Sequence, residues 1–214
     1  MGRRSVGRRR GPSDPIARAV ALHADAARLR AAGEHRVALA AARRALDLFR
    51  RHEGAAHPDV AAALLEVGAA LELNDRWAEA LQQYERSERL LARYARLRDP
   101  ALRRLRVKTD RAIAGVLRAL GRYDEGERYA RRAIAQATAW FGARDLDLAG
   151  ALNDLGMLHK YQGRYAEAPP LYRRALAILR ATGMDESSDA ASLYHNLGGI
   201  EHARGRYARA EEPS

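Results

Sequence analysis

A short unit recurs along this chain at an almost constant interval. The unit starts at Gly33, Asp75, Gly121, Gly163 and Gly205, so successive units are 42, 46, 42 and 42 residues apart. Self-similarity at such a period is typical of stacked repeats, in which each repeat packs on its neighbours instead of closing around one central core. The sequence therefore predicts a repeat array, whose default role is to bind a partner.

Two positions of the repeat carry only small side chains. Alanine or glycine stands seven residues before every unit start, at Ala26, Gly68, Ala114, Gly156 and Gly198. The same residue types stand five residues after it, at Ala38, Ala80, Gly126, Ala168 and Ala210. Because small side chains let helices approach closely, these positions predict the crossing of two antiparallel helices joined by a short turn.

An aromatic residue recurs two positions after the unit start. It is present as Trp77, Tyr123, Tyr165 and Tyr207, with His35 in the first repeat. Larger apolar residues recur eight positions before the start, at Val67, Ile113, Leu155 and Leu197. Offsets of three, four and seven residues mark helical faces. We therefore interpret the aromatics as packing residues and not as a cofactor site.

Capping residues and prolines indicate where helices begin, and glycines indicate where they end. First helices are predicted near residues 16–31, 59–73, 100–119, 147–161 and 188–203. Second helices are predicted near residues 35–52, 77–97, 123–140 and 165–181. Since almost every residue outside the turns falls in one of these segments, the predicted fold class is all-α.

With the repeat laid out, the chain resembles tetratricopeptide repeat proteins of the longer-repeat type found in kinesin light chains and many bacterial proteins. The resemblance is clearest in LNDLGMLHKYQGRYAEAPPLYRRALAIL, residues 152–179, and in HNLGGIEHARGRYARAEEP, residues 195–213. It implies a right-handed superhelical solenoid of antiparallel helix pairs, with about four full repeats and a truncated fifth. It also implies a non-catalytic adaptor that binds protein segments, or the sensor arm of a bacterial transcriptional regulator.

This interpretation divides the chain into a basic leader, residues 1–14, and a repeat array, residues 15–214. The repeats are expected near residues 16–56, 57–98, 99–143, 144–185 and 186–214. Because terminal repeats normally need a polar cap, the apolar face of residues 188–203 is expected to stay partly uncovered. We expect either that the natural array is longer or that the protein self-associates through this end.

The chain carries a formal net charge of +11, to which the leader contributes strongly through Arg3, Arg4, Arg8, Arg9 and Arg10. No apolar stretch follows these charges, so a secretory signal is not indicated. A disordered basic leader is one interpretation, and a contact with nucleic acid or an acidic surface is the other. A nucleic-acid-associated role therefore stays open as the alternative to peptide binding.

No catalytic, cofactor-binding or metal-binding pattern is recognisable. The sequence lacks cysteine, which excludes disulfides and is compatible with the reducing cytosol of a cytoplasmic protein. No apolar run approaches the roughly 20 residues that a membrane span needs. His52 and His57 flank a helix-ending glycine, and His195 and His202 stand about 10 Å apart along a helix, so neither pair can share a zinc ion. We predict no enzymatic activity, no metal and no cofactor.

In the family that the chain resembles, the first helix of each pair lines the concave face of the solenoid. Residues 13, 10, 6 and 3 positions before the unit start share one helical face that is distinct from the packed positions. The candidate peptide-binding residues on this face are Lys108, Arg111, Arg118, Asn153, Met157, Lys160, His195 and His202. The middle of the groove is basic, which favours an acidic or C-terminal peptide, and Asn153 can bond a peptide main chain. The other interpretation is that these charges only keep an unfilled surface soluble.

Overall fold

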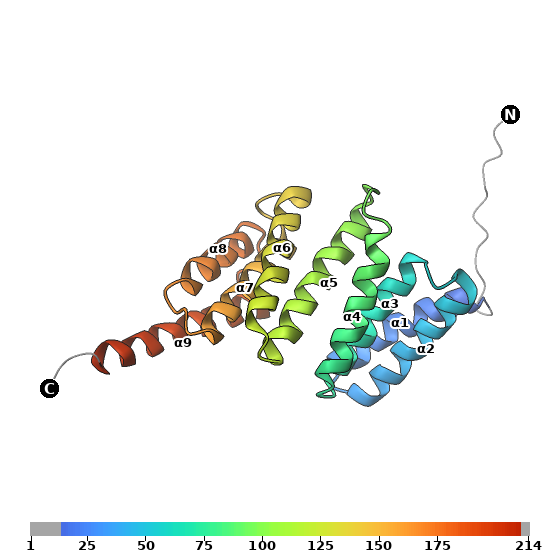
Figure 1. Cartoon of the computed structure of the whole chain (residues 1–214), viewed down its shortest axis with the longest axis horizontal. Helices are drawn as coiled ribbons and strands as arrows, with labels where there is room; N and C mark the ends of the chain where they lie inside the picture. Colours follow the sequence, from blue (N-terminus) through green and yellow to red (C-terminus); the bar gives the residue numbers. More distant parts are fainter. Residues whose placement is uncertain (1–13, 211–214) are drawn as a thin grey trace. The chain divides into compact units, whose positions relative to one another are not determined.

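The structure is a computed structural model in which residues 14–210 are described, and these residues form nine α-helices and no strand (Figure 1). They divide into two compact units, one that ends at Leu91 and one that begins at Ala92. The predicted all-helical repeat fold is confirmed for the described residues. Residues 1–13 of the basic leader and residues 211–214 lie outside them, so the expectations for the leader stay predictions.

The first unit contains the helices α1 (Pro15–Ala31), α2 (His35–Glu53), α3 (Pro58–Glu72) and α4 (Trp77–Ala92). α1 packs on α2, and α2 packs on α3. α4 is fixed to α3 by a hydrogen bond 2.9 Å long, which the buried Ser87 hydroxyl donates to the carbonyl oxygen of Ala61. Two successive helix pairs therefore lie in this unit.

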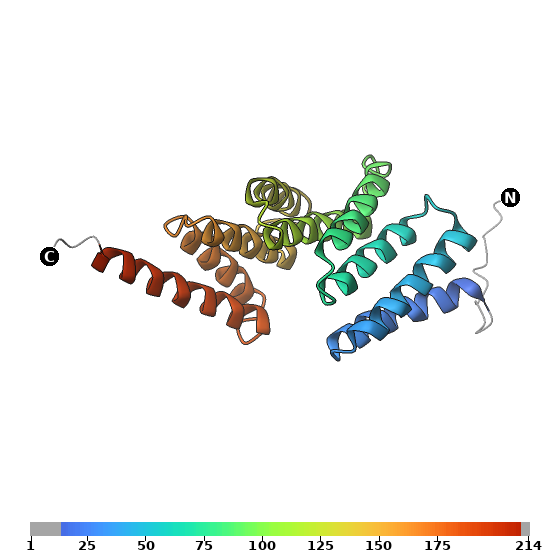
Figure 2. The same ribbon diagram turned by 60° about the horizontal axis from the view of Figure 1, so that its bottom comes forward.

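The second unit contains the helices α5 (Pro100–Ala119), α6 (Tyr123–Phe141), α7 (Leu146–Tyr161), α8 (Ala168–Ala181) and α9 (Ser188–Ala210). Neighbouring helices run antiparallel, as Figure 2 shows for this unit, drawn from green to red. The first helices of successive repeats also contact one another, α5 with α7 and α7 with α9. This second set of contacts places the predicted concave residues of three repeats side by side.

The predicted unit starts are the turns between paired helices. Gly33, Gly121 and Gly163 have backbone φ angles of 80°, 73° and 75°, and Asp75 has the same left-handed conformation with a φ of 56°. Glycine adopts this conformation without strain, and aspartate is one of the few other residues that visit it. The aspartate at the second turn therefore preserves the turn geometry, and the repeat frame is confirmed over four turns.

Aspartates cap three of the first helices at the places that the sequence indicates. Asp14, Asp99 and Asp145 each accept a hydrogen bond from the backbone N–H two residues later, at 3.0, 2.8 and 2.9 Å. An aspartate at this position satisfies an N–H group that the helix itself leaves unbonded. The caps therefore fix where α1, α5 and α7 begin, and with them where the concave side chains stand.

The two small positions lie in the contact between the helices of a repeat. The alanines at these positions are fully buried in the first four repeats, namely Ala26, Ala38, Ala80, Ala114 and Ala168. The glycines Gly68, Gly126 and Gly156 are buried as well. Gly198 of α9 is the exception, since it is exposed. The predicted role of these positions in helix crossing is confirmed for four repeats.

The small residue seven positions before the turn is matched in size to the residue nine positions after the turn, which belongs to the second helix of the same repeat. A Cβ atom on Gly68 would lie 2.2 Å from the ring of Tyr84, and one on Gly156 would lie 2.4 Å from the ring of Tyr172. Both tyrosines are buried. In the other two repeats the same positions hold buried alanines, Ala26 with Ala42 and Ala114 with Ala130. Where the first helix has glycine, the second helix has tyrosine at the matched position, and where the first helix has alanine, the second helix has alanine.

An ion pair that the repeat pattern had not indicated also recurs at the turns. An arginine one residue after the turn position pairs with a glutamate three residues later, as Arg76–Glu79, Arg122–Glu125 and Arg164–Glu167, at 2.6, 2.7 and 2.5 Å. Hydrogen bonding to arginine lowers the pKa of each glutamate. Because these groups are well exposed, the pairs contribute little to stability.

Two helix ends differ from the predicted ones. α8 begins at Ala168 and not at residue 165, because Pro169 and Pro170 lack amide hydrogens and fit a helix only in its first turn. α4 ends at Ala92 and not at residue 97. Residues 95–98 are all exposed, Leu97 included, so tertiary packing does not extend the helix.

α9 is one continuous helix, whereas the sequence predicted a turn at Gly205. Gly205 lacks the positive φ of the glycines at the other turns. The first part of α9 still packs as the first helix of a repeat, because Ala190, Leu193 and Ile200 are buried. The beginning of a fifth second helix, expected after Gly205, is therefore not formed, and the helix runs on to Ala210.

Candidate functional site

The first helices α5, α7 and α9 line two adjoining hollows in the second unit. The smaller has a volume of about 150 Å³ and is lined by Arg111, Gly150 and Asp189 among other residues. The larger has a volume of about 530 Å³. Asn153 and Ser192 line both hollows, so the two form one continuous depression, which we call the α5–α7–α9 groove.

Five of the eight predicted peptide-binding residues line this groove, namely Arg111, Arg118, Asn153, Met157 and His195. Lys108, Lys160 and His202 line neither hollow. Lys108 and His202 are exposed, and the Lys160 ammonium nitrogen lies beside Gly199, 3.5 Å from where a Cβ atom of that residue would stand. The structure therefore brings five of the predicted residues together, and ligand binding by them stays a prediction.

The charge of the groove differs from the expected one. Arg111 donates a hydrogen bond from Nε to Asp154 at 2.7 Å, and the attraction of Asp154 raises the pKa of Arg111. The guanidinium group rests on Gly150, where a Cβ atom would lie 2.2 Å from it. Asp189 adds a second negative charge to the lining. The groove is thus closer to charge balance than the row of cations in the sequence indicated.

A pair of asparagine amides lies in the centre of the groove. Asn196 of α9 donates a hydrogen bond from Nδ2 to Oδ1 of Asn153 of α7, at 3.3 Å. Each amide has one acceptor and two donor hydrogens, so this bond leaves the Asn153 amide hydrogens and the Asn196 carbonyl oxygen for other partners. Together they present one donor group and one acceptor side by side, which matches the hydrogen-bonding groups of a peptide main chain.

Arg118 supplies the positive charge of the larger hollow. Its guanidinium carbon lies 5.1 Å from the centre of the Tyr161 ring, and Tyr161 stacks on Tyr123 with ring centres 6.3 Å apart. No carboxylate partner of Arg118 is seen among residues 14–210. Stacking on an aromatic ring orients the guanidinium group without neutralising it. Arg118 is therefore the cation of the groove that is best placed to bind an anionic group.

Asp154 and Asn196 are groove residues that the predicted strip omits. Both stand nine positions before a unit start, Gly163 or Gly205, whereas the strip used positions 13, 10, 6 and 3. Side chains three or four residues apart share a helical face, so position nine extends the strip between positions 13 and 6. The bonds Arg111–Asp154 and Asn153–Asn196 each join position ten of one repeat to position nine of the next, 43 residues later.

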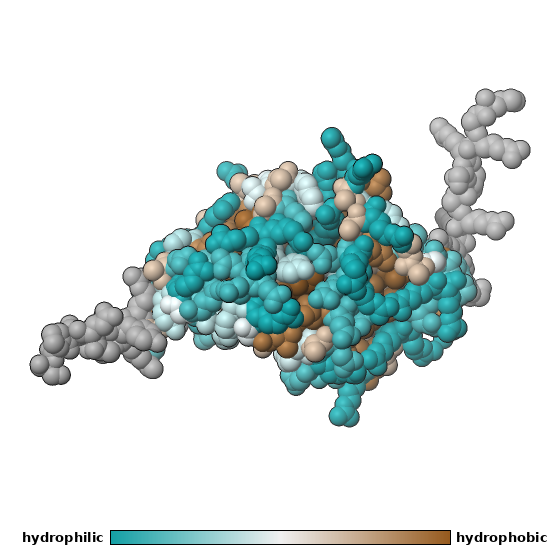
Figure 3. Space-filling view, in the orientation of Figure 1, coloured by the Kyte–Doolittle hydropathy of each residue, from teal (hydrophilic) through white to brown (hydrophobic). Residues whose placement is uncertain are grey.

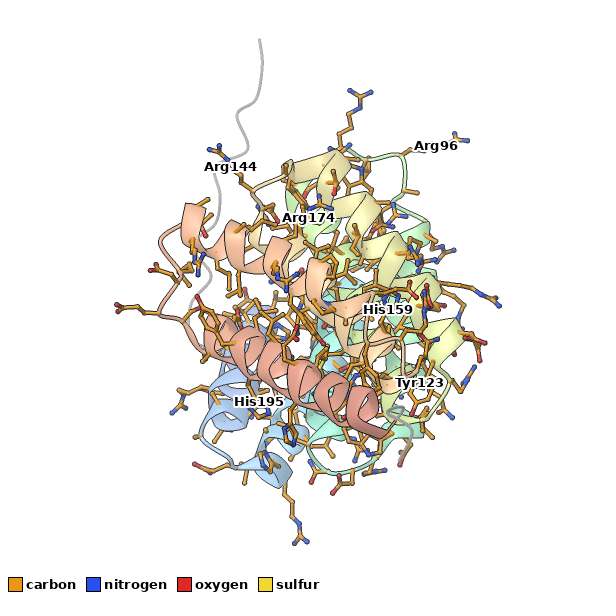
Figure 4. All side chains as sticks on the ribbon, turned by 90° about the vertical axis from the view of Figure 1, so that its left-hand side faces the viewer. Arg96, Tyr123, Arg144, His159, Arg174 and His195 are labelled. Carbon is orange, nitrogen blue, oxygen red and sulfur yellow. The ribbon has the colours of Figure 1, made fainter. Side chains whose placement is uncertain are left out.

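Figure 4 places His195 and His159 on opposite sides of the α9 ribbon. His195 is exposed and lines the larger hollow, whereas His159 of α7 is buried. The two histidines therefore belong to different environments.

Outside the groove, the face shown in Figure 3 is mostly hydrophilic, as expected for helices whose outer residues are largely charged.

A cluster of three potential metal ligands lies between α2 and α3, at a place where the sequence predicted no metal site. Glu53, His57 and Asp59 bring one ligand atom each within 4.8 Å of one another. His57 Nδ1 lies 2.7 Å from Glu53 and accepts a hydrogen bond from the backbone N–H of Asp59 at 3.3 Å. These contacts cap α3, so the cluster has a structural role in the link between the helices.

His159 is a buried polar residue at a packing position. Its side chain is 4 % exposed, with Nε2 3.6 Å from Glu127 and Nδ1 4.0 Å from Glu167, and Arg164 binds both glutamates. Burial and the charge of Arg164 lower the pKa of His159 from its usual 6.5. The corresponding residues of the first three repeats are leucines, namely Leu29, Leu71 and Leu117.

We expect His159 to make the protein less stable as the pH falls below about 6.5. Its folded pKa is lower than its unfolded pKa, so its contribution is complete above the unfolded pKa and is lost as the pH falls toward the folded one. Urea denaturation between about pH 7.5 and 5.5 should show a smaller loss of stability for His159→Leu than for the wild type. Glutamates whose pKa values are lowered, such as Glu127, change the stability only at more acidic pH. Equal losses in both proteins would show that His159 is not the cause.

The recurring geometry agrees with a match in sequence. The profile of the tetratricopeptide repeat family matches residues 105–181 and 147–213, which together span just over half of the chain. The chain belongs to the tetratricopeptide repeat family. The two matched segments cover most of α5 and all of α6 to α9, and so include the helices α5, α7 and α9 that line the groove. No curated protein matches the chain in sequence.

Several solved structures share this fold. A putative kinesin light chain from Podosopora anserina with nearly identical tetratricopeptide-like repeats is 20 % identical, with a TM-score of 0.71, over 94 % of this chain and 92 % of that one. BtubC from P. vanneervenii is 20 % identical, with a TM-score of 0.62, over 92 % of this chain and 85 % of that one. A Rap protein solved in complex with Competence and Sporulation Factor is 17 % identical, with a TM-score of 0.75, over 91 % of this chain and 51 % of that one. These similarities establish the fold.

Within the described residues, no helix has both the length and the apolar character of a membrane span.

Proposed function

We propose that this tetratricopeptide repeat protein is a non-catalytic scaffold, which binds a peptide segment of a partner protein in the α5–α7–α9 groove. The observation that carries the proposal is the convergence of polar side chains from three successive first helices on two joined hollows. Gly115 and Ala191, which line the larger hollow, have small side chains and leave room for a ligand. The Rap protein with the same fold was solved in complex with a factor, which supports a ligand-binding role.

Recognition of the main chain is assigned to the asparagine pair. The free amide hydrogens of Asn153 would donate to a peptide carbonyl oxygen, and the free carbonyl oxygen of Asn196 would accept from a peptide N–H. Such contacts bind a peptide without regard to its sequence. A partly exposed methionine, Met157, lies in the same hollow and can adapt its side chain to apolar residues of the ligand.

An acidic side chain or a C-terminal carboxylate of the peptide is assigned to Arg118. Arg111 is engaged by Asp154, so it positions α5 against α7 and is not available for a strong second contact. Lys160 stands beside Gly199 and can add positive charge near the groove without lining it. The proposed ligand therefore has one anionic group, because the negative charges of Asp154 and Asp189 disfavour a strongly acidic segment.

Selection from a random peptide library on the immobilised full chain tests the proposal. Selected peptides should bind the wild type and lose about fivefold in affinity for Asn153→Ala, because one lost hydrogen bond to the main chain costs about 1 kcal/mol. Arg118→Gln should weaken the same peptides, and amidation or neutralisation of their anionic group should have no further effect on that variant. Fluorescence anisotropy measures each affinity.

Arg174→Glu serves as the matched control, since Arg174 is an exposed arginine of α8 and lines neither hollow. This variant should bind the selected peptides as well as the wild type does. Peptides that bind Asn153→Ala and Arg118→Gln with unchanged affinity would place the binding site elsewhere. Failure to select any peptide would contradict the proposal itself.

A further inference from the structure

α9 has three faces, and one of them is only partly covered. The first face packs in the second unit through Ala190, Leu193 and Ile200, and the second lines the groove through Ser192 and His195. The third face carries Tyr194, Leu197, Gly198 and Glu201. Tyr194 is 47 % exposed, and its hydroxyl accepts a hydrogen bond from Arg180 of α8 at 2.8 Å. Leu197 is half-buried against the core of the second unit, whereas Gly198 and Glu201 are exposed. Figure 4 looks onto this end of the unit and shows α9 as its foremost helix.

The repeat frame identifies what this third face corresponds to. Its residues stand 11, 8, 7 and 4 positions before Gly205. In α3 and α7 the corresponding positions are buried, and the glycine at position seven packs on a tyrosine of the second helix of the same repeat. In α7 they are Leu152, Leu155, Gly156 and His159, and all are buried. In α3 they are Leu64, Val67, Gly68 and Leu71, which are buried too. The third face of α9 is therefore the binding face for a second helix.

Gly198 indicates which kind of helix fits. No atom of the described chain lies within 4 Å of the position that its Cβ would take. At the corresponding Gly68 and Gly156, the space is filled by the rings of Tyr84 and Tyr172. Those tyrosines follow a buried alanine four residues earlier, Ala80 and Ala168, so that both contacts come from one face of the second helix.

We infer that the third face of α9 binds an amphipathic helix of a partner protein, one that carries a small residue and, four positions later, a tyrosine. The tyrosine ring would lie over Gly198, and apolar residues of the partner helix would cover Leu197 and Tyr194. This contact repeats in trans the packing that the chain uses twice in cis. It is independent of peptide binding in the α5–α7–α9 groove, because it uses a different face of α9.

A peptide with the sequence of α4, residues 77–92, is a suitable probe because it contains Ala80 and Tyr84 and no proline. The fluorescein-labelled peptide is titrated with the full chain, and anisotropy is measured. We expect saturable binding at concentrations below about 1 mM, and binding at least about tenfold weaker for the Tyr84→Ala peptide. A peptide that does not saturate, or that binds equally well without the tyrosine, would overturn the inference.

Two neighbouring glycines of α9 offer matched variants. Gly198→Leu fills the space that the tyrosine ring needs, whereas Gly199→Leu adds the same side chain on the side of Lys160. Both are exposed helical positions where leucine is a better helix former, so neither change should unfold the protein. Gly198→Leu should abolish peptide binding and Gly199→Leu should preserve it. Binding that survives Gly198→Leu would be at another site and would overturn the inference.

Two further measurements distinguish this contact from binding in the groove and from self-association. Asn153→Ala and Arg118→Gln, which test the groove, should leave binding of the α4 peptide unchanged. If these two variants no longer bound the α4 peptide, the peptide would be bound in the groove, and the inference would be overturned. Sedimentation of the chain alone detects self-association. A dimer that Gly198→Leu dissociates, together with no binding of the peptide, would assign the third face to a second copy and not to a separate partner helix.

Discussion

Replacing Gly156 with alanine is expected to lower the free energy of unfolding by about 3 kcal/mol. The new methyl group would stand 2.4 Å from the Tyr172 ring, which is fully buried and cannot move aside without disturbing its neighbours. Cores resist added volume because their side chains are already close-packed. Urea denaturation of the full chain, followed by circular dichroism, measures the loss.

Gly115→Ala is the matched control, since Gly115 is also helical but has no atom within 4 Å of its Cβ position. This change should increase stability by up to about 1 kcal/mol, because alanine is the better helix former. The contrast separates steric conflict from the general effect of removing a glycine. A Gly156→Ala variant that is as stable as Gly115→Ala would show that the Tyr172 ring does not determine the residue at position 156.

The alanine pairs of the other repeats make this prediction more specific. Tyr172→Ala alone should cost about 3–5 kcal/mol, because it leaves a cavity. In that background Gly156→Ala should cost nothing further, since the double variant reproduces the pair Ala114 and Ala130. The double-mutant cycle should therefore give a coupling of about 3 kcal/mol, the cost that Gly156→Ala has in the wild type. Additive losses would contradict a direct contact between the two positions.

Arg132→Met is expected to destabilise the protein by about 3 kcal/mol. Arg132 of α6 binds both carboxylate oxygens of Asp110 of α5, at 2.8 and 2.6 Å, and the Asp110 side chain is only 4 % exposed. Removal of the arginine leaves a buried carboxylate without its principal counter-charge, which is far less favourable than the intact pair. Urea denaturation at neutral pH gives the magnitude.

Arg131→Met provides the comparison, because Arg131 is the adjacent residue and pairs with Glu127 while 58 % exposed. Its loss should cost less than about 1 kcal/mol. The double variant Asp110→Leu with Arg132→Met should be at least as stable as the wild type, since Leu64 and Leu152 are buried at the corresponding positions. If Arg132→Met costs no more than Arg131→Met, the buried pair is not important for stability.

The repeat frame could be predicted closely, since both small positions are visible in the sequence and three of the four turns carry a glycine. Each depends on local geometry that one residue type satisfies. The start of α8 could also be predicted, because Pro169 and Pro170 fit a helix only in its first turn. The repeat pattern alone places this start three residues too early. The continuity of α9 through Gly205 was not readable, because glycine permits a left-handed turn without enforcing one.

The groove was predicted less completely than the fold. Helical periodicity placed Arg111, Arg118 and Asn153 on the correct face, but it does not show which neighbour in the next repeat each residue contacts. The predicted strip therefore omits Asp154 and Asn196, and it does not reveal that Asp154 neutralises Arg111. Charges counted along one sequence strip overestimate the net charge of a surface whenever partners come from the adjacent helix.

The two kinds of contact in the array differ in what happens when a repeat is duplicated or exchanged. The match of Gly156 with Tyr172 lies within a single repeat, so a copied repeat carries its own core with it. The bonds Arg111–Asp154 and Asn153–Asn196 cross from one repeat to the next, so every new junction creates a new combination of groove residues. Recombination of repeats in such a chain would therefore preserve folding while altering the residues that line the groove.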